Sequence, residues 1–129
     1  LRVTCDDGRA VLDRAAPGSY DAVVLDAFVG AEPVRALATV EAARAARAAL
    51  RPGGALVANV VSRAGGSDVS FLRAHVGSLL VAFAHVAVAS AEGPTYLTAL
   101  QAFSTYEPEV HAIPFDDDFP APALHDGDV

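Results

Sequence analysis

The chain has 129 residues, of which 53% are hydrophobic, so it fits one folded domain and is not intrinsically disordered. Its formal net charge of −7 disfavours a nucleic-acid or membrane partner, because such partners bind basic surfaces. The single cysteine, the lack of a visible signal peptide and the absence of any apolar run near the roughly 18 residues that span a bilayer together indicate a cytoplasmic protein.

The first quarter of the chain predicts a strand, a helix and a second strand. Leu1–Cys5 is predicted as a strand, and Arg9–Ala15 as a short helix that Asp6 or Asp7 would cap. Tyr20–Leu25 is an apolar run without alternation, which is typical of a strand covered on both faces. Because the chain opens inside a strand, we expect it to be truncated at its N-terminus.

A loop, a long helix and a third strand are predicted next. Asp26–Pro33 is a loop long enough to fold over a site, and Val34–Leu50 is an amphipathic helix. The turn Arg51–Gly54 should end that helix with a left-handed glycine cap. Ala55–Val61 is the third strand.

The second half predicts one more helix and a hairpin. After a loop at Ser62–Ser67, the helix spans about Val69–Phe83, with an inner face that consists of Phe71, Leu72, Val76, Leu79 and Leu80. His85–Ala91 and Tyr96–Phe103 should pair as antiparallel strands across a short turn.

The element order predicts an α/β fold with a mixed sheet. The first three strands, joined by helices, should be parallel, and the last two should form the antiparallel hairpin at one edge. We assign residues 1–104 to this domain. Residues 105–129 are rich in proline and aspartate, which predicts an extended, poorly packed acidic tail.

Polar residues lie at or near the carboxyl end of each of the three strands that should be parallel. They are Asp6-Asp7-Gly8, Asp26-Ala27-Phe28 and Asn59. Since the carboxyl ends of parallel strands meet at one rim, these residues should form a pocket for a ligand with hydroxyls, amines or a cation. Gly8 would let a flat ring approach the backbone closely, and Phe28 could stack on that ring. In the structural alternative, one aspartate is only a helix cap and Asn59 is a buried amide.

Other reactive side chains give weaker signals. The four histidines, at positions 75, 85, 111 and 125, lack metal-ligand spacing, so we predict no metal site and assign them to the surface or the core. Cys5, on the first predicted strand, fits a small core residue better than a nucleophile.

An ordered set of motifs resembles the spermidine synthase-like family, whose members have the S-adenosylmethionine-dependent methyltransferase fold, a Rossmann-like fold. The motifs are Asp7–Leu12 (DGRAVL), Tyr20–Phe28 (YDAVVLDAF), Leu37–Glu41 (LATVE), Leu50–Gly54 (LRPGG) and Asn59-Val60. The resemblance covers residues 1 to about 104. It implies that the chain corresponds to the later part of the fold, and that the glycine-rich turn lies upstream.

The resemblance also implies a chemistry and a set of roles. Asp7 and Gly8 would contact the adenine of decarboxylated S-adenosylmethionine or S-adenosylmethionine, with Asp6, Ala27 and Phe28 also lining the nucleoside site. Asp26 would accept a proton from an attacking amine, and Asn59 would help to bind that amine. The parent enzyme would transfer an aminopropyl group, whereas residues 1–129 alone are not expected to turn over.

One departure from the family pattern keeps alternatives open. Spermidine synthases usually carry a second aspartate three residues after the first, where this chain has Val29, with Glu32 as a substitute nearby. The alternatives are a methyltransferase that uses intact S-adenosylmethionine and a degenerate, non-catalytic nucleoside-binding or interaction domain. A phospho-receiver domain is excluded, since it needs a lysine and every cationic side chain other than histidine here is arginine. A homodimer could form through an exposed sheet edge.

Overall fold

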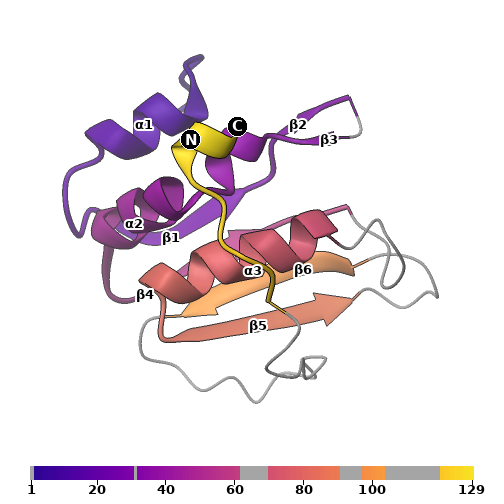
Figure 1. The fold of residues 1–129 in the computed structure, drawn as a ribbon. Coiled ribbons are helices and arrows are strands. Elements are labelled where there is room, and N and C mark those ends of the chain that lie inside the picture. The colour runs from indigo at the N-terminus through magenta and orange to yellow at the C-terminus, as the bar shows by residue number, and fades with distance from the viewer. Residues whose placement is uncertain (1, 31, 62–69, 91–96, 104–119) are drawn as a thin grey trace.

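The computed structural model describes residues 2–30, 32–61, 70–90, 97–103 and 120–129. Its main sheet has four strands in the order β1-β4-β6-β5 (Figure 1). These strands are β1 (Tyr20–Leu25), β4 (Leu50–Ala58), β6 (Leu97–Phe103) and β5 (His85–Ser90). The helices are α1 (Gly8–Arg14), α2 (Val40–Ala49) and α3 (Ser70–Ala82), with short 3₁₀ turns η1 (Arg35–Leu37) and η3 (Asp126–Asp128).

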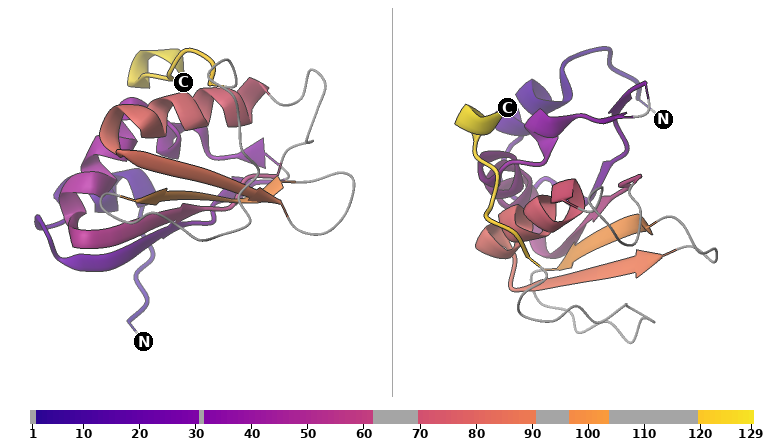
Figure 2. Two further views of the ribbon diagram at one scale, coloured as in Figure 1. Left: turned by 90° about the horizontal axis from the view of Figure 1, so that it is seen from below. Right: turned by 45° about the vertical axis from the view of Figure 1, so that its right-hand side comes forward.

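The sheet is mixed, as the order of elements predicts. Strands β1 and β4 are parallel, with Ala22 opposite Ala55 and Leu25 opposite Ala58. Strand β6 is antiparallel to both β4 and β5, which confirms the terminal hairpin. The left panel of Figure 2 shows α2 and α3 on one face of this sheet. Among the described helices, none has the length and apolar composition to cross a membrane.

The predicted strand at Leu1–Cys5 is wrong for its described part, residues 2–5. These residues have no regular structure, Val3 is 83% exposed, and Cys5 is exposed as well, so it is not a core residue. A strand needs a neighbour for its backbone hydrogen bonds, and in the described parts of the chain β1 pairs only with β4.

Strand β1 has the predicted bounds but lies at an edge of the described sheet. Its side chains are covered on one face only: Val23 and Leu25 pack against the core, whereas Val24 is 67% exposed. The expectation of two covered faces is therefore wrong for the described residues. The expectation came from the apolar run without alternation, which is typical of strands that are covered on both faces.

Helix α2 is shorter than predicted, and its caps explain both ends. The Thr39 hydroxyl accepts a hydrogen bond from the amide of Ala42 at 3.2 Å, which starts the helix there, and η1 occupies the residues before it. At the other end the cap is Leu50 in an extended conformation, where β4 already begins. Gly53, with a φ of 79°, lies instead within β4, where the pairing with β1 shifts register.

Helix α3 forms as predicted, with one error in its inner face. Leu72, Val76 and Leu79 are buried and Phe71 packs against them, but Leu80 is 40% exposed. The predicted loop at Ser62–Ser67, the helix residue Val69 and the hairpin turn lie outside the described residues. The core lies between α2, α3 and the sheet, and its buried apolar side chains include Leu12, Ala46, Leu50, Leu56, Leu72, Val76, Leu79 and Val88.

The last ten residues pack against the helices, so the prediction of a poorly packed tail is wrong for residues 120–129. The amide of Leu124 donates to the Ser78 hydroxyl at 3.0 Å, and its carbonyl accepts from the amide of Val40 at 2.8 Å. The amide of Ala121 donates to the carbonyl of Arg73 at 3.2 Å. Figure 1 shows this segment, in yellow, crossing α3. Residues 104–119 of the predicted tail lie outside the described residues.

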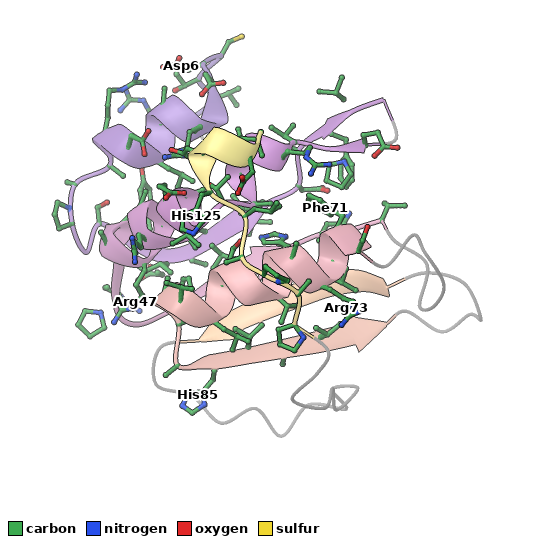
Figure 3. The ribbon with its side chains drawn as sticks, viewed as in Figure 1. Asp6, Arg47, Phe71, Arg73, His85 and His125 are labelled. Carbon is green, nitrogen blue, oxygen red and sulfur yellow. The ribbon has the colours of Figure 1, made fainter. Side chains whose placement is uncertain are left out.

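An ion pair fastens the end of this segment to α1. Arg9 donates from both terminal guanidinium nitrogens to the two carboxylate oxygens of Asp126, at 2.7 and 2.9 Å. The buried Thr39 hydroxyl donates to Asp126 at 2.8 Å. Next to this pair, His125 contacts Glu41 at 2.8 Å, and Figure 3 labels His125 in the segment. The bidentate geometry is the strong form of an arginine–carboxylate contact.

These contacts should weaken in acid. The hydrogen bond from Arg9 is the main cause that lowers the pKa of Asp126 from 3.8, and the hydrogen bond from His125 lowers the pKa of Glu41 from 4.5. A carboxyl whose pKa is lower in the folded chain stabilises it above the unfolded pKa, and that stabilisation is lost as pH falls through the folded value. Denaturant unfolding should therefore show a loss of stability as pH falls below about 4.5, the ordinary pKa of the Glu41 carboxyl.

A matched pair of variants isolates the contribution of Asp126. Asp126→Asn should reduce the loss of stability in acid, whereas Asp21→Asn, which removes a carboxylate paired with Arg51 instead, should leave most of it. An unchanged acid response in Asp126→Asn would show that this segment does not carry it.

Candidate functional site

Asp26 and Asn59 meet at the carboxyl ends of β1 and β4. Each residue comes directly after the last residue of its strand, and the amide of Asn59 donates to the carbonyl of Leu25 at 2.9 Å. The side-chain Nδ2 of Asn59 then donates to Oδ1 of Asp26 at 2.9 Å. Asp26 is exposed and Asn59 is half-buried. The expected convergence of these strand ends is therefore confirmed for Asp26 and Asn59.

A groove of about 480 Å³ runs along the open side of β1 to Asp26. Asp6, Gly8, Asp26 and Ala27, four of the predicted site residues, line it together. Its other walls are mainly apolar side chains of α1 and β1, including Val11, Tyr20 and Val24. The volume lies within the range of about 300–1,000 Å³ that small-molecule sites occupy.

The two aspartates before α1 have different partners. Asp7 is the N-cap of α1, because its carboxylate accepts from the amide of Ala10 at 2.8 Å. Asp6 accepts a hydrogen bond from the amide of Asp7 and pairs with Arg14. Both contacts lower the pKa of the Asp6 carboxyl, and the hydrogen bond from the amide has the larger effect. Figure 3 labels Asp6 at the start of α1. The structural reading thus holds for Asp7, whose role toward adenine stays a prediction.

Gly8 is a glycine that its surroundings do not require. A Cβ built at this position would be 3.7 Å from Cδ1 of Leu37, an ordinary van der Waals distance. Gly8 is also not one of the described glycines with a positive φ, so its backbone is not in the left-handed region. Since neither packing nor backbone geometry demands glycine, the free space at Gly8 is available to a ligand in the groove.

The expected loop after Asp26 contains a small hairpin, β2 (Phe28–Val29) and β3 (Glu32–Pro33). Val29 lies directly opposite Glu32 in this hairpin. Directly opposed residues on antiparallel strands have Cβ atoms only about 5 Å apart. The Glu32 side chain therefore leaves the backbone next to Val29, the position at which spermidine synthases usually carry a second aspartate. Phe28 is half-buried opposite Pro33.

A second, smaller cavity of about 20 Å³ shares Leu25, Ala27 and Leu37 with the groove. Asn59, Phe71 and His75 also line it. His75 is buried, in agreement with the assignment of the histidines to the surface or the core, but its place beside Asn59 was not predicted. The available signal was its spacing of four residues from Phe71, whose ring centroid lies 5.9 Å from that of His75. Figure 3 labels Phe71 near the start of α3.

In the described part of the chain, no three His, Cys, Asp or Glu side chains are grouped closely enough to hold a metal ion. The site consists of the exposed carboxylate of Asp26, the Asn59 amide that donates to it, and the adjoining groove.

No protein-family model and no curated protein sequence matches the chain. Solved structures do. A probable spermidine synthase from Corynebacterium glutamicum superposes with a TM-score of 0.71 at 29% identity, over 84% of this chain and 40% of that one. The spermidine synthase of Thermotoga maritima gives 0.68 at 15% identity, over 84% and 36%. A T. thermophilus 16S rRNA methyltransferase in complex with AdoMet and guanosine gives 0.50 at 24% identity, over 82% and 24%.

These likenesses define the class of protein. The fold is an α/β Rossmann-like fold of the S-adenosylmethionine-dependent methyltransferase type. More particularly, the chain has a spermidine synthase-like fold, as its motifs predict, and it spans 40% and 36% of the lengths of the two spermidine synthase chains.

Proposed function

We propose that this chain is the acceptor-side part of an aminopropyltransferase-type enzyme, in which a decarboxylated S-adenosylmethionine binds in the groove and an amine binds at Asp26. The observation that carries the proposal is the Asp26–Asn59 pair at the end of a groove of about 480 Å³. The similarity to a probable spermidine synthase at 29% identity supports the same reading.

Aminopropyl transfer requires that the amine be held, deprotonated and positioned. An amine with a pKa near 10 is protonated at neutral pH and cannot attack, so a carboxylate must hold it and take its proton. Asp26 would do both, because Asn59 engages Oδ1 and leaves Oδ2 for the ammonium group. The neutral nitrogen then forms a bond to the aminopropyl carbon beside the sulfonium as the carbon–sulfur bond breaks, and a neutral thioether leaves. Positioning would supply most of the acceleration.

Glu32 supports recognition of an acceptor with two amines. Its Cα is paired with that of Val29, so its longer side chain can reach the region that a second aspartate would serve. We propose that Glu32 binds the distal ammonium group of a diamine. If the enzyme instead transfers a methyl group from intact S-adenosylmethionine, this second contact is not needed, and a comparison of the two donors separates the functions.

The nucleoside half of the proposal is tested at Gly8. The full-length protein should bind methylthioadenosine, the thioether product. Gly8→Ala should weaken that binding roughly tenfold, because a methyl group would enter the groove where the base approaches. Isothermal titration calorimetry measures both. Folding should not suffer, since alanine fits at the start of α1.

Gly127→Ala is the matched control, because a Cβ at Gly127 meets nothing within 4 Å and lies outside the groove. It should bind as the unsubstituted chain does. No heat from the full-length protein at millimolar ligand would favour a degenerate, non-catalytic interaction domain. Equal binding by Gly8→Ala would place the nucleoside elsewhere.

Two further expectations stay predictions. We propose a cytoplasmic setting, in which the exposed thiol of Cys5 would remain reduced. A homodimer would use the free edge of β1, where no described strand pairs. Size measurement over a concentration series tests it.

A further inference from the structure

His75 is a buried histidine with unmet hydrogen-bonding capacity. It lies on α3, and its exposed fraction is only 4%. Within the described part of the chain, neither of its ring nitrogens has a hydrogen-bond partner. The same holds for Oδ1 of Asn59, the amide oxygen on the side away from Asp26. Buried polar atoms are nearly always paired with protein or with ordered water, so these atoms need an account.

His75 and Asn59 line the same small cavity. It measures about 20 Å³, and its other walls are mostly apolar, from Leu25, Val34 and Phe71. A cavity needs about 10–15 Å³ of this kind of volume to hold one water molecule, and the water needs at least two polar partners. The cavity meets both conditions and is too small for a larger ligand.

We propose that His75 and Asn59 hold one water molecule in this cavity, and that His75 thereby positions the Asn59 amide for its hydrogen bond to Asp26. His75 is a positioning residue, because it acts on Asp26 only through the water and Asn59.

One water molecule can satisfy one ring nitrogen of His75 together with Oδ1 of Asn59. A neutral imidazole has one N–H donor and one acceptor nitrogen, so in either tautomer it can bind a water molecule that donates to Oδ1 of Asn59. Burial lowers the pKa of His75 to about 4, which keeps the ring neutral at pH 7. With Oδ1 bound to water, the Asn59 amide has one orientation, in which its NH₂ group faces the carboxylate at 2.9 Å.

For catalysis the consequence rests on the proposed function. A fixed Asn59 holds Oδ1 of Asp26, so that the other carboxylate oxygen keeps a constant direction toward the amine. The water site itself does not depend on that function, and it can be tested without any substrate.

The sequence provides a direct spectroscopic probe. Asn59 is the single asparagine and Gln101 the single glutamine, so a ¹⁵N spectrum of the chain contains only two side-chain amide NH₂ pairs. We expect a cross-peak between the ring C–H protons of His75 and a long-lived water. In His75→Phe, which keeps a ring but removes both nitrogens, the Asn59 NH₂ signals should shift and exchange with solvent about tenfold faster. His75→Gln, which restores a donor and an acceptor, should reverse most of the change.

His85→Phe is the matched control, because His85 is exposed at the start of β5. It should leave the Asn59 signals in place. Absence of the water cross-peak in the unsubstituted chain, or Asn59 signals that do not respond to His75→Phe, would overturn the inference. The cross-peak decides the matter even if His75→Phe fails to fold. Failure of methylthioadenosine or amine binding would overturn the proposed function and leave the water site standing.

Discussion

Replacing Asp26 by asparagine should lower the rate of aminopropyl transfer by about 100- to 10,000-fold, the usual contribution of a positioned general base. Asparagine keeps the size of the side chain and can still contact Asn59, but it cannot accept a proton. The measurement is kcat with decarboxylated S-adenosylmethionine and putrescine, in the full-length protein. Raising the pH should partly restore activity, because more of the amine is then neutral without help.

Asp21→Asn is the control on the same strand. Asp21 is exposed at the other end of β1 and pairs with Arg51, so its loss should change kcat by no more than about threefold. A rate for Asp26→Asn within the same range would remove Asp26 from the mechanism. Parallel assays with intact S-adenosylmethionine show whether the affected reaction is aminopropyl or methyl transfer.

Replacing Gly77 by alanine should destabilise the chain by about 1–3 kcal/mol, although the same change inside a helix usually stabilises. The reason is the packing of the C-terminal segment on α3. A Cβ at Gly77 would lie 2.4 Å from the carbonyl oxygen of Ala121, and 3.4 Å from the amide nitrogen of Ala123. The segment must move away, which strains the nearby hydrogen bonds of Leu124 with Ser78. Denaturant unfolding measures the change.

Combining Gly77→Ala with Asp126→Ala tests this explanation. Both changes loosen the same segment, so their effects on the free energy of unfolding should sum to less than the two separate losses. A stabilising effect of Gly77→Ala alone, as helix propensity predicts, would mean that the segment does not pack there in solution.

The sequence predicts best where local signals agree. Tyr20–Leu25 has turn residues before it and a polar residue after it, and its bounds match those of β1. The meeting of Asp26 with Asn59 was predictable as well, since it follows from two parallel strands ending at one rim. A helix cap at Asp6 or Asp7 was predictable from their place before an apolar repeat, and the structure shows that Asp7 is the cap.

The errors arise where distant residues decide the outcome. Leu1–Cys5 has strand-like residues, but a strand needs a partner, and local pattern contains no information about one. The tail composition predicts an extended chain, yet Asp126 finds Arg9, which lies 117 positions earlier. The start of α2 is a local error instead. Apolar periodicity runs through Val34–Ala38, and only the capping hydroxyl of Thr39 shows that α2 begins after these residues.

The Arg9–Asp126 contact also bears on the order of folding. Joining positions 117 apart closes nearly the whole chain into a loop, and the entropy cost of closure rises with loop length. The helices and the β1–β4 pair involve shorter loops, so we expect them to form before the C-terminal segment docks. Contacts that form after the rate-limiting step do not speed folding; they slow unfolding. The last ten residues would then chiefly slow unfolding, and so lengthen the lifetime of a sheet that assembles without them.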